Sequence, residues 1–408
     1  MWKDALAKAA VEEKSWPYDW VAGVDYPHKN ERAVVTGKLV LNDPQAPDSK
    51  MSNLFVGLSA PDYTPARINR GGFGGFGLAG GGDDDTNTPA ANLAGGAFGR
   101  GTNGGFNFTN RFNRFGTNFG GDGTNQFGGR RRFGRGGFGG GGFGGFGPRL
   151  VEWQNDAKSY EFWVRADASG NFSIPNVRSG NYTLHAFADG VLGEFTLTNV
   201  TVEAGKNLAL GKLNWQPVRY GKQLWDIGIP NRKASEFFKG DDYFHWGWYL
   251  EYPKLFPKDV YYVVGKSDFH KDWFFEQLPH NENAGNTTGS GQGRSTTWSV
   301  AFNLPKAPRG KATLRLAICG IGARNLTATI NEQSIGSVTG LVYNATINRD
   351  GIGGTLTTRD LSFDAALMKA GENVLKLTIP GGGLTSGVEY DYLRLELDEA
   401  AGVTSAKP

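Results

Sequence analysis

The stretch EFWVRADASGNFSIPNVRSGNYTLHAFADGVLGEFTLTNVTVEAG, residues 161–205, decides the fold class of this 408-residue chain. It consists of short segments in which apolar and polar residues alternate, separated by turns rich in Gly, Asn and Asp. In NYTLHAFADG, the side chains of Tyr182, Leu184 and Ala186 fall on one face of an extended strand. Such segments predict an antiparallel β-sandwich, because one face of each strand packs on a core while the other meets solvent.

The last part of this stretch, FTLTNVTVEAG, keeps the alternation but changes its register once. Phe195 and Leu197 share one face of the strand. The pattern resumes at Val200 and Val202, after a shift at Asn199. Because a β-bulge inserts one extra residue in this way, we expect both apolar pairs to face the same core.

A low-complexity segment, residues 71–147, interrupts the strand pattern. It contains 30 of the 62 glycines and 13 of the 27 phenylalanines, with seven Arg and four Asp but no Lys or Glu. Its net charge of +3 equals that of the whole chain, so the remainder is neutral. This composition cannot offset the entropy lost on ordering the backbone, which predicts a disordered loop. Strand patterns at residues 31–43 and 52–62 precede it and others follow, so the loop is expected within one domain.

The second half of the chain is again patterned as strands. From Pro217 it is first rich in Trp and Tyr, and then contains TTWSVAFNLP, KATLRLAICG, ENVLKLTIPGG and VEYDYLRLELDE. Strands at this spacing, with almost no helical periodicity, predict a second sandwich of the jelly-roll type. The expected parts are a short helix and linker (1–30), a sandwich (31–216) with its loop (71–147), a jelly roll (217–400) and a tail (401–408).

Composition excludes several classes of protein. A single cysteine, Cys319 in LRLAICG, rules out a disulfide framework and is expected to face a strand core. No apolar run approaches the roughly 20 residues of a membrane-spanning helix. The first residues, MWKDALAKAAVEEKS, contain acids and no apolar core, so they predict a short helix that Pro17 helps to end and not a signal peptide.

Motifs with a recognisable chemistry are scarce. The chain has no H-E-x-x-H, no G-x-S-x-G and no Cys pair. Only KSDFHKDW, residues 266–273, clusters a histidine with Lys and Asp, and we interpret it as a solvated turn. Asp241, Asp242 and Asp268 could supply oxygen ligands to a structural Ca²⁺, although isolated loop acids are usually only solvated. No catalytic residue, no cofactor and no further metal site are therefore predicted.

Several longer segments resemble a known family. QLWDIGIPNRKASEFFKGDDY (223–243), LFPKDVYYVVGKSDFHKDWFFEQ (255–277) and VEYDYLRLELDE (388–399) are similar to the C-terminal domain of rhamnogalacturonan lyases, polysaccharide lyase family 4. Residues 159–195 resemble the middle, fibronectin-III-like domain of the same family. WPYDW (16–20) is similar to the exit from its catalytic domain.

The resemblance implies a function that this chain performs only in part. Members of the family cleave rhamnogalacturonan I, a pectic polysaccharide, by β-elimination, with a Lys and a His of an N-terminal domain. Neither residue maps onto this chain, so the resemblance implies that the catalytic domain is absent and that a carbohydrate-binding region remains. Its expected partners are pectic polysaccharide and an upstream catalytic domain or lyase chain. Its expected location is extracellular or periplasmic, with no membrane contact.

An unusual density of aromatic residues marks the candidate binding site. YFHWGWYLEYPKLFP, residues 243–257, holds rings that could fill a core or stack on the apolar face of a sugar. Trp246, Trp248 and Tyr249 are the expected surface rings, because Gly247 leaves space beside them, and Arg349 is the expected charged partner. The rings expected in the core are Trp225, Phe256, Tyr262, Trp273 and Phe275.

The Arg-rich part of the loop keeps an alternative function open. GGRRRFGRGGFGGGG, residues 128–142, could bind single-stranded nucleic acid, with Arg on phosphates and Phe stacked on bases. The same segment could instead promote self-association of the chain. The small net charge and the absence of any resemblance to RNA-binding modules in the flanking segments favour the carbohydrate-binding interpretation.

Overall fold

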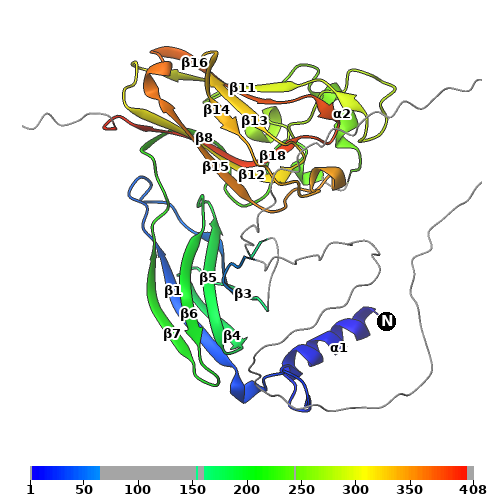
Figure 1. The fold of residues 1–408 in the computed structure, drawn as a ribbon, viewed down its shortest axis with the longest axis vertical. Helices are drawn as coiled ribbons and strands as arrows, with labels where there is room; N and C mark the ends of the chain where they lie inside the picture. The colour runs from blue at the N-terminus through cyan, green and yellow to red at the C-terminus, as the bar shows by residue number, and fades with distance from the viewer. Residues whose placement is uncertain (1, 65–152, 155–159, 243–244, 402–408) are drawn as a thin grey trace, which may run out of the picture. The chain divides into compact units, whose positions relative to one another are not determined.

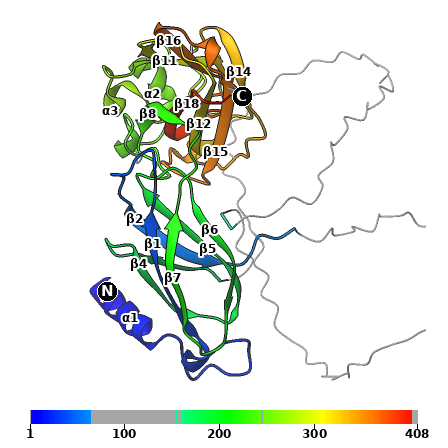
Figure 2. The same ribbon diagram turned by 90° about the vertical axis from the view of Figure 1, so that its left-hand side faces the viewer.

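The computed structural model describes residues 2–64, 153–154, 160–242 and 245–401. The segment predicted to be a disordered loop, residues 71–147, lies outside these residues, as does nearly all of the predicted tail. Most regular elements in the described part are β-strands, 18 of 25, and nearly all of these strands belong to two sandwiches (Figures 1 and 2). The all-β class predicted from the sequence is therefore confirmed.

The described chain begins with helix α1 (Trp2–Ser15), the helix expected before Pro17. An ion pair between Lys8 and Glu12, at 2.8 Å, spans one turn of α1 and supports it locally. None of its residues is buried, so α1 contributes nothing to a hydrophobic core. The short 3₁₀ helix η1 (Lys29–Glu31) then leads into the first strand.

The first sandwich has the three-plus-four arrangement expected of a fibronectin-III-like domain. One sheet has the order β4-β1-β7 and the other the order β3-β2-β5-β6. Strands β1 and β7 are parallel, whereas the other pairs are antiparallel. The strands are β1 (Ala33–Leu41), β2 (Ser52–Ser59), β3 (Phe162–Arg165), β4 (Asn171–Val177), β5 (Gly180–Asp189), β6 (Phe195–Val202) and β7 (Leu208–Trp215).

The core of this sandwich follows the predicted alternation. Tyr182, Leu184 and Ala186 of β5 are all buried. The expected bulge in β6 is present, because the pairing with β5 skips a residue and Asn199 has a φ of 60°. Asparagine tolerates this left-handed conformation better than most residues, since its short side chain can bond locally.

The second sandwich is a jelly roll of two larger sheets, in the orders β14-β13-β16-β11-β9 and β15-β12-β18-β8, with a small two-stranded sheet β10-β17. Its strands are β8 (Lys222–Gly228), β9 (Tyr261–Val263), β10 (Gln292–Gly293), β11 (Thr296–Leu304), β12 (Lys311–Ile321), β13 (Leu326–Ile330), β14 (Gln333–Val338), β15 (Thr357–Asp364), β16 (Gly371–Ile379), β17 (Gly382–Gly383) and β18 (Val388–Asp398). Its helices are η2 (Gly240–Asp242), α2 (Trp248–Leu255), α3 (Phe269–Asp272), η3 (Ile347–Arg349) and η4 (Ala365–Leu367).

Aromatic side chains fill the core of the jelly roll. Of the five rings predicted there, four are buried and Phe256 is partly buried against them. Trp273 has no exposed surface, and its ring meets that of Trp298 edge to face at 4.9 Å. Cys319 is also fully buried, as predicted.

Strands β2 and β3 are antiparallel neighbours, with Leu58 opposite Phe162. The long segment between them therefore leaves β2 and enters β3 at the same end of these two neighbouring strands. We expect that replacing residues 71–147 with a short Gly/Ser linker leaves cooperative unfolding of the first sandwich intact, because closure entropy grows slowly with loop length. Thermal melting followed by near-ultraviolet circular dichroism checks this. Loss of the cooperative transition would show that the segment is part of the folded domain.

Candidate functional site

One buried carboxylate brings the candidate site together. Asp350, which follows η3, accepts hydrogen bonds from the main-chain N–H groups of Gly247 (2.8 Å) and Trp248 (3.2 Å). These groups lie at the N-terminus of α2, where N–H groups have no partner within the helix. Asp350 therefore caps α2 from a distant segment, and its hydrogen bonds join the segment that contains Trp246 to the segment that contains Arg349.

The side chains around this cap present rings and polar groups to solvent. The indole of Trp246 is 66% exposed and meets the ring of Tyr249 edge to face at 5.8 Å. Tyr343 is also exposed, and its hydroxyl accepts a 2.6 Å hydrogen bond from the amide of Asn348. We call the exposed side chains of the two segments that meet at this cap the Trp246 face: Trp246 from one segment, and Tyr343, Asn348 and Arg349 from the other.

Two of the expected surface rings do not lie on the surface. Trp248 and Tyr249 are 3% and 4% exposed, so the prediction that they are surface rings is wrong. Trp248 packs against the aromatic core, and its indole N–H donates to the main-chain oxygen of Asp242 at 3.1 Å. The prediction from Gly247 failed because this glycine is required by the backbone conformation and does not open space beside the rings. Its φ of 89° lets the chain turn into α2. A sugar-binding role for Trp246 and Arg349 stays a prediction.

The histidine cluster is a short solvated element, as interpreted from the sequence. Asp268 accepts a hydrogen bond from the main-chain N–H of His270 and so caps α3. Its carboxylate also lies 3.4 Å from the ammonium group of Lys271. Within the described residues, no group of three or more His, Cys, Asp or Glu side chains is arranged to hold a metal ion. Calcium binding by Asp241, Asp242 and Asp268 therefore remains only a prediction.

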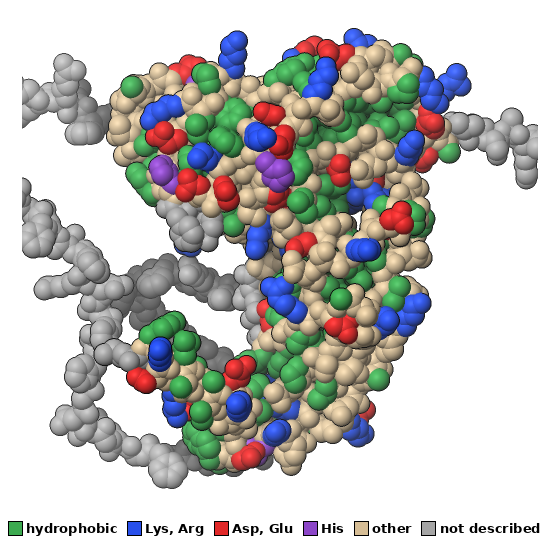
Figure 3. Space-filling model, turned by 180° about the vertical axis from the view of Figure 1, so that it is seen from behind, with side chains coloured by type: hydrophobic (Ala, Val, Ile, Leu, Met, Phe, Trp, Pro, Cys, Tyr) green, Lys and Arg blue, Asp and Glu red, His purple; other side chains and the backbone are tan. Residues whose placement is uncertain are grey.

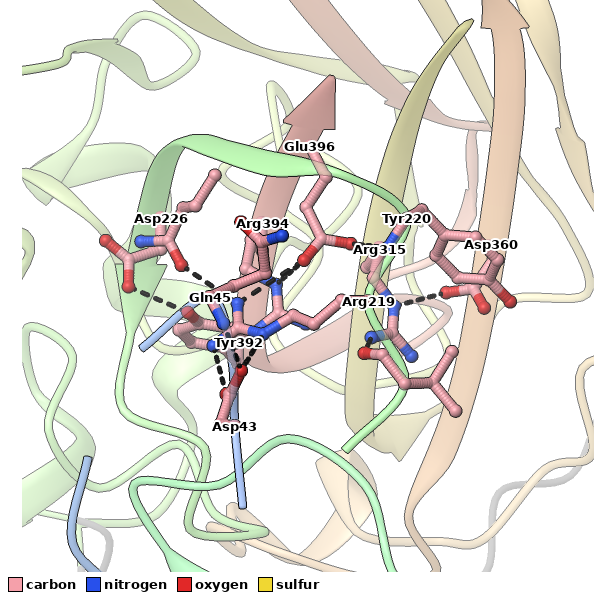
Figure 4. Close-up of polar contacts among 12 residues, drawn as sticks. Asp43, Gln45, Arg219, Tyr220, Asp226, Arg315, Asp360, Tyr392, Arg394 and Glu396 are labelled. Carbon is pink, nitrogen blue, oxygen red and sulfur yellow. Dashed lines mark hydrogen bonds and ion pairs between the residues drawn. The ribbon is translucent and has the colours of Figure 1, made fainter. Parts of the chain in front are cut away.

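A network of ion pairs joins the first sandwich to the jelly roll (Figure 4). Arg219 lies between two carboxylates, 2.6 Å from Asp43 and 3.3 Å from Glu396. Arg394 pairs with the same Glu396 at 3.0 Å. Burial acts to raise the pKa of Asp43, but the hydrogen bonds from Arg219 hold this pKa below its ordinary value. Because each carboxylate here already has a cationic partner, the network is suited to docking the sandwiches and not to proton transfer.

Two other buried carboxyl groups in the jelly roll have no such partner. Gln277 and Val388 pair through two main-chain hydrogen bonds, so the flanking residues Glu276 and Glu389 face each other across this bridge. Both are fully buried, and three of their four carboxyl oxygens have no hydrogen-bond partner in the described structure. Burial, and then the neighbouring Glu389, raises the pKa of Glu276 well above its ordinary value. Glu276 is therefore expected to be protonated at neutral pH.

A serine, a histidine and a carboxylate align on the first sandwich. The hydroxyl of Ser59 lies 3.0 Å from Nε2 of His185, whose Nδ1 lies 2.5 Å from the carboxylate of Glu194. A nucleophile, a base and an orienting acid would have this order. However, Ser59 is 1% exposed, and its hydroxyl also lies 3.1 Å from the main-chain oxygen of Ala60. A substrate cannot reach this hydroxyl, so the array is structural. Sequence reasoning missed it because its members are brought together only by strand pairing.

Comparison with known families settles the relationship. The model of polysaccharide lyase family 4, domain III, matches residues 223–395. The model of domain II of the same family matches residues 141–210. The two models together match more than half of the chain. The chain belongs to polysaccharide lyase family 4. The jelly roll thus corresponds to domain III, and the first sandwich to domain II, as the resemblance had implied.

Curated relatives are fungal lyases. The chain is 29% identical to a "Probable rhamnogalacturonate lyase B" of Aspergillus fumigatus over 292 residues, which are 59% of this chain and 43% of that protein. It is 27% identical to rhamnogalacturonate lyase B of Emericella nidulans over 288 residues, 59% of this chain and 42% of that protein. The chain therefore spans about two fifths of the length of the curated relatives it matches.

Several solved structures that are similar to part of this chain are carbohydrate-binding modules. A family 35 module from an environmental isolate is 20% identical, covers 30% of this chain and 86% of its own, and superposes with a TM-score of 0.19. A family 35 module from Clostridium thermocellum is 22% identical, covers 30% and 88%, and has a TM-score of 0.18. These scores are too low to add to the fold assignment, which rests on the strand order. None of the described helices is long and apolar enough to cross a membrane.

The buried carboxyl groups predict how stability depends on pH. The folded-state pKa of Asp391 is raised by burial from 3.8 to about 7, and that of Glu276 is raised above 4.5. Raised acid pKa values mean that the folded state binds more protons than the unfolded state. This stabilisation is complete below about pH 4 and is lost as the pH rises through the folded-state values. We expect Glu276→Gln to raise the free energy of unfolding at pH 8 and to flatten its decline between pH 5 and pH 8.

Urea denaturation at pH 5 and pH 8 measures this effect. Glu372→Gln, an exposed change on β16, is the matched control and should alter neither value. If Glu276→Gln lowered stability at pH 8, the carboxylate would instead be charged and bound to a cation.

Proposed function

We propose that this chain is the carbohydrate-binding region of a rhamnogalacturonan lyase and that it holds pectic rhamnogalacturonan I through the Trp246 face. Support comes first from the match to domains II and III of the lyase family. It comes next from the exposed indole of Trp246, held at a turn that Asp350 fixes. A fixed, exposed ring can pack on the apolar face of a sugar without losing much side-chain entropy on binding.

The polar members of the face suit the rest of the ligand. Asn348 and Arg349 lie on the same 3₁₀ helix, and the amide of Asn348 donates to the hydroxyl of Tyr343. Amides bond sugar hydroxyls, and an arginine can bond the carboxylate of a galacturonate residue through two N–H groups. Rhamnogalacturonan I alternates neutral rhamnose with acidic galacturonate, so it offers both kinds of group.

The described residues do not supply the chemistry of the lyase reaction. β-Elimination needs a base at the C5 proton and cationic groups at the neighbouring carboxylate, all converging on one sugar. The described histidine nearest to lysines is His270, and its Nδ1 donates to the main-chain oxygen of Glu236 at 2.7 Å. We therefore assign catalysis to another part of the lyase. The place of action that follows is extracellular or periplasmic, where pectin is found.

The charge seen on one face of the molecule does not favour nucleic-acid binding. On this face, Lys and Arg side chains are interspersed with Asp and Glu side chains (Figure 3). A mixed arrangement of this kind lacks the single-sign patch that attracts nucleic acid strongly. The Arg-rich segment proposed for nucleic-acid binding, residues 128–142, lies outside the described residues.

We expect the purified chain to leave rhamnogalacturonan I uncleaved. β-Elimination creates an unsaturated uronide, which absorbs in the ultraviolet, so the assay follows absorbance with time. A recombinant family 4 lyase serves as the positive control. Sustained product formation that survives repurification of the chain would contradict the assignment of catalysis to another part of the lyase.

We expect Trp246→Ala to weaken binding of rhamnogalacturonan I oligosaccharides roughly tenfold, because stacking on one ring contributes on the order of 1–2 kcal/mol. Titration calorimetry measures the affinity at low and high salt. Trp248 is left intact, since truncating this buried ring would damage the core. Tyr261→Ala, which removes a ring that is 56% exposed on strand β9, is the matched control and should bind as the parent does.

Salt separates the two candidate functions. Binding that rests on rings should change little between low and high salt. Binding of single-stranded RNA through the Arg-rich segment should fall steeply, with a slope set by the phosphates contacted. Tight, salt-sensitive RNA binding with no oligosaccharide binding would contradict the proposed function.

A further inference from the structure

The outer face of the four-stranded sheet in the first sandwich is unusually aromatic. Phe55, Trp163 and Phe187 point away from the core, where an exposed antiparallel sheet normally presents polar side chains. Trp163 lies directly over Gly57, whose missing side chain makes room, since a Cβ there would come within 2.2 Å of the indole. An aromatic layer on an outer sheet face indicates a contact surface.

Trp153 completes this layer. Its ring lies 4.9 Å from that of Trp163 and 5.1 Å from that of His185. It is also parallel to the ring of Phe187, with an angle of 10° between the planes. These contacts fix the plane of the Trp153 indole against the sheet.

A cavity of about 500 Å³ opens beside Trp153. This volume is within the range of small-ligand sites, which usually combine an apolar wall with a few placed polar groups. The apolar wall here is the indole of Trp153. The polar walls include the hydroxyls of Thr183 and Thr196, the amide of Asn199 and the carboxylate of Asp62.

Buried hydrogen bonds hold the walls of this cavity in place. Glu194 accepts from the indole N–H of Trp153 at 3.3 Å and pairs with His185. His185 is 4% exposed and is fixed from its other side by Ser59. Arg232 lies 3.6 Å from the second oxygen of Glu194 and covers the ring of Phe187. The array that resembles a catalytic triad therefore has a role, which is to orient the indole and the polar wall.

The charge of the lining selects among ligands. The cavity is lined by the carboxyl side chains of Asp62 and Glu194, and no Lys or Arg is among its described lining residues. Glu194 is already paired with Arg232 and His185, so Asp62 is the carboxylate that would repel an anionic sugar. Sugar hydroxyls can instead donate to Asp62 and exchange hydrogen bonds with the threonines. The flat indole offers an apolar surface to the C–H face of a ring.

We propose that the Trp153 cavity is a second sugar-binding site, on domain II, for an uncharged pyranose of a polysaccharide. It shares no residue with the Trp246 face and does not depend on the function proposed for that face. A chain with both sites could hold a polysaccharide at an acidic backbone and at a neutral part of the same molecule.

The test compares two disaccharides of similar size, galactobiose and digalacturonic acid, by titration calorimetry and saturation-transfer NMR on the full chain. Galactobiose should bind, and Trp153→Ala should weaken that binding at least tenfold. Thr196→Val, which removes one exposed hydroxyl at nearly constant volume, should weaken it two- to fivefold. Trp246→Ala should leave galactobiose binding unchanged, which separates this site from the other face.

Three results would overturn the proposal. The first is no binding of galactobiose to the parent chain. The second is binding that neither Trp153→Ala nor Thr196→Val weakens. The third is that digalacturonic acid binds more tightly than galactobiose and that Trp153→Ala abolishes the binding of digalacturonic acid. Trp153 lies outside the hydrophobic core cluster of the first sandwich, so near-ultraviolet circular dichroism is expected to show both variants folded.

Discussion

The jelly roll depends on the packing of its aromatic core, and helix α2 enters that core through Tyr252. This side chain has no exposed surface, and its hydroxyl accepts a 2.9 Å hydrogen bond from the indole of Trp298 on β11. Burial raises its pKa far above the ordinary value of 10, so the hydroxyl stays neutral. With α2 anchored in this way and capped by Asp350, Trp246, which precedes the N-cap residue Gly247, is left outside the core. The same constraint that buries Trp248, Tyr249 and Tyr252 therefore leaves Trp246 exposed.

Strand patterns and core rings could be predicted from the sequence because they depend on local alternation. Tyr182, Leu184 and Ala186 follow a period of two, and all three side chains of this strand, β5, are buried. The error at Trp248 and Tyr249 came from judging space beside a glycine without considering a helix. These two residues and Tyr252 have the i, i+1, i+4 spacing of one helical face, and this signal would have placed them together in the core.

Other features depend on long-range pairing and carry no local signal. Glu276 lies between apolar residues in FFEQL and Glu389 is the second residue of β18, so nothing nearby in the sequence indicates that the two face each other. The same holds for Ser59 and His185, which are 126 residues apart in the chain. One wall of the cavity is Trp153 itself, which follows the low-complexity segment in the chain. Such sites appear only when the pairing of the strands is known.

Buried ionisable groups are stabilised in two ways in this molecule. Where the two sandwiches meet, Arg219 is shared by Asp43 and Glu396, so removing one partner would leave a buried charge uncompensated. Inside the jelly roll, burial raises the pKa values of Glu276 and Glu389 well above the ordinary value, which favours their protonated, neutral forms. The Trp246 face, which we propose as the binding surface, has neither arrangement among its exposed side chains, which suits recognition through rings, an amide and one guanidinium.

The most direct test of the central claim follows the indole N–H signals of the ¹⁵N-labelled chain during titration with a rhamnogalacturonan I oligosaccharide. If the exposed ring of Trp246 stacks on the sugar, its signal should shift progressively, while those of the buried Trp248 and Trp273 stay in place. The account is contradicted if the Trp246 signal does not move at saturating oligosaccharide.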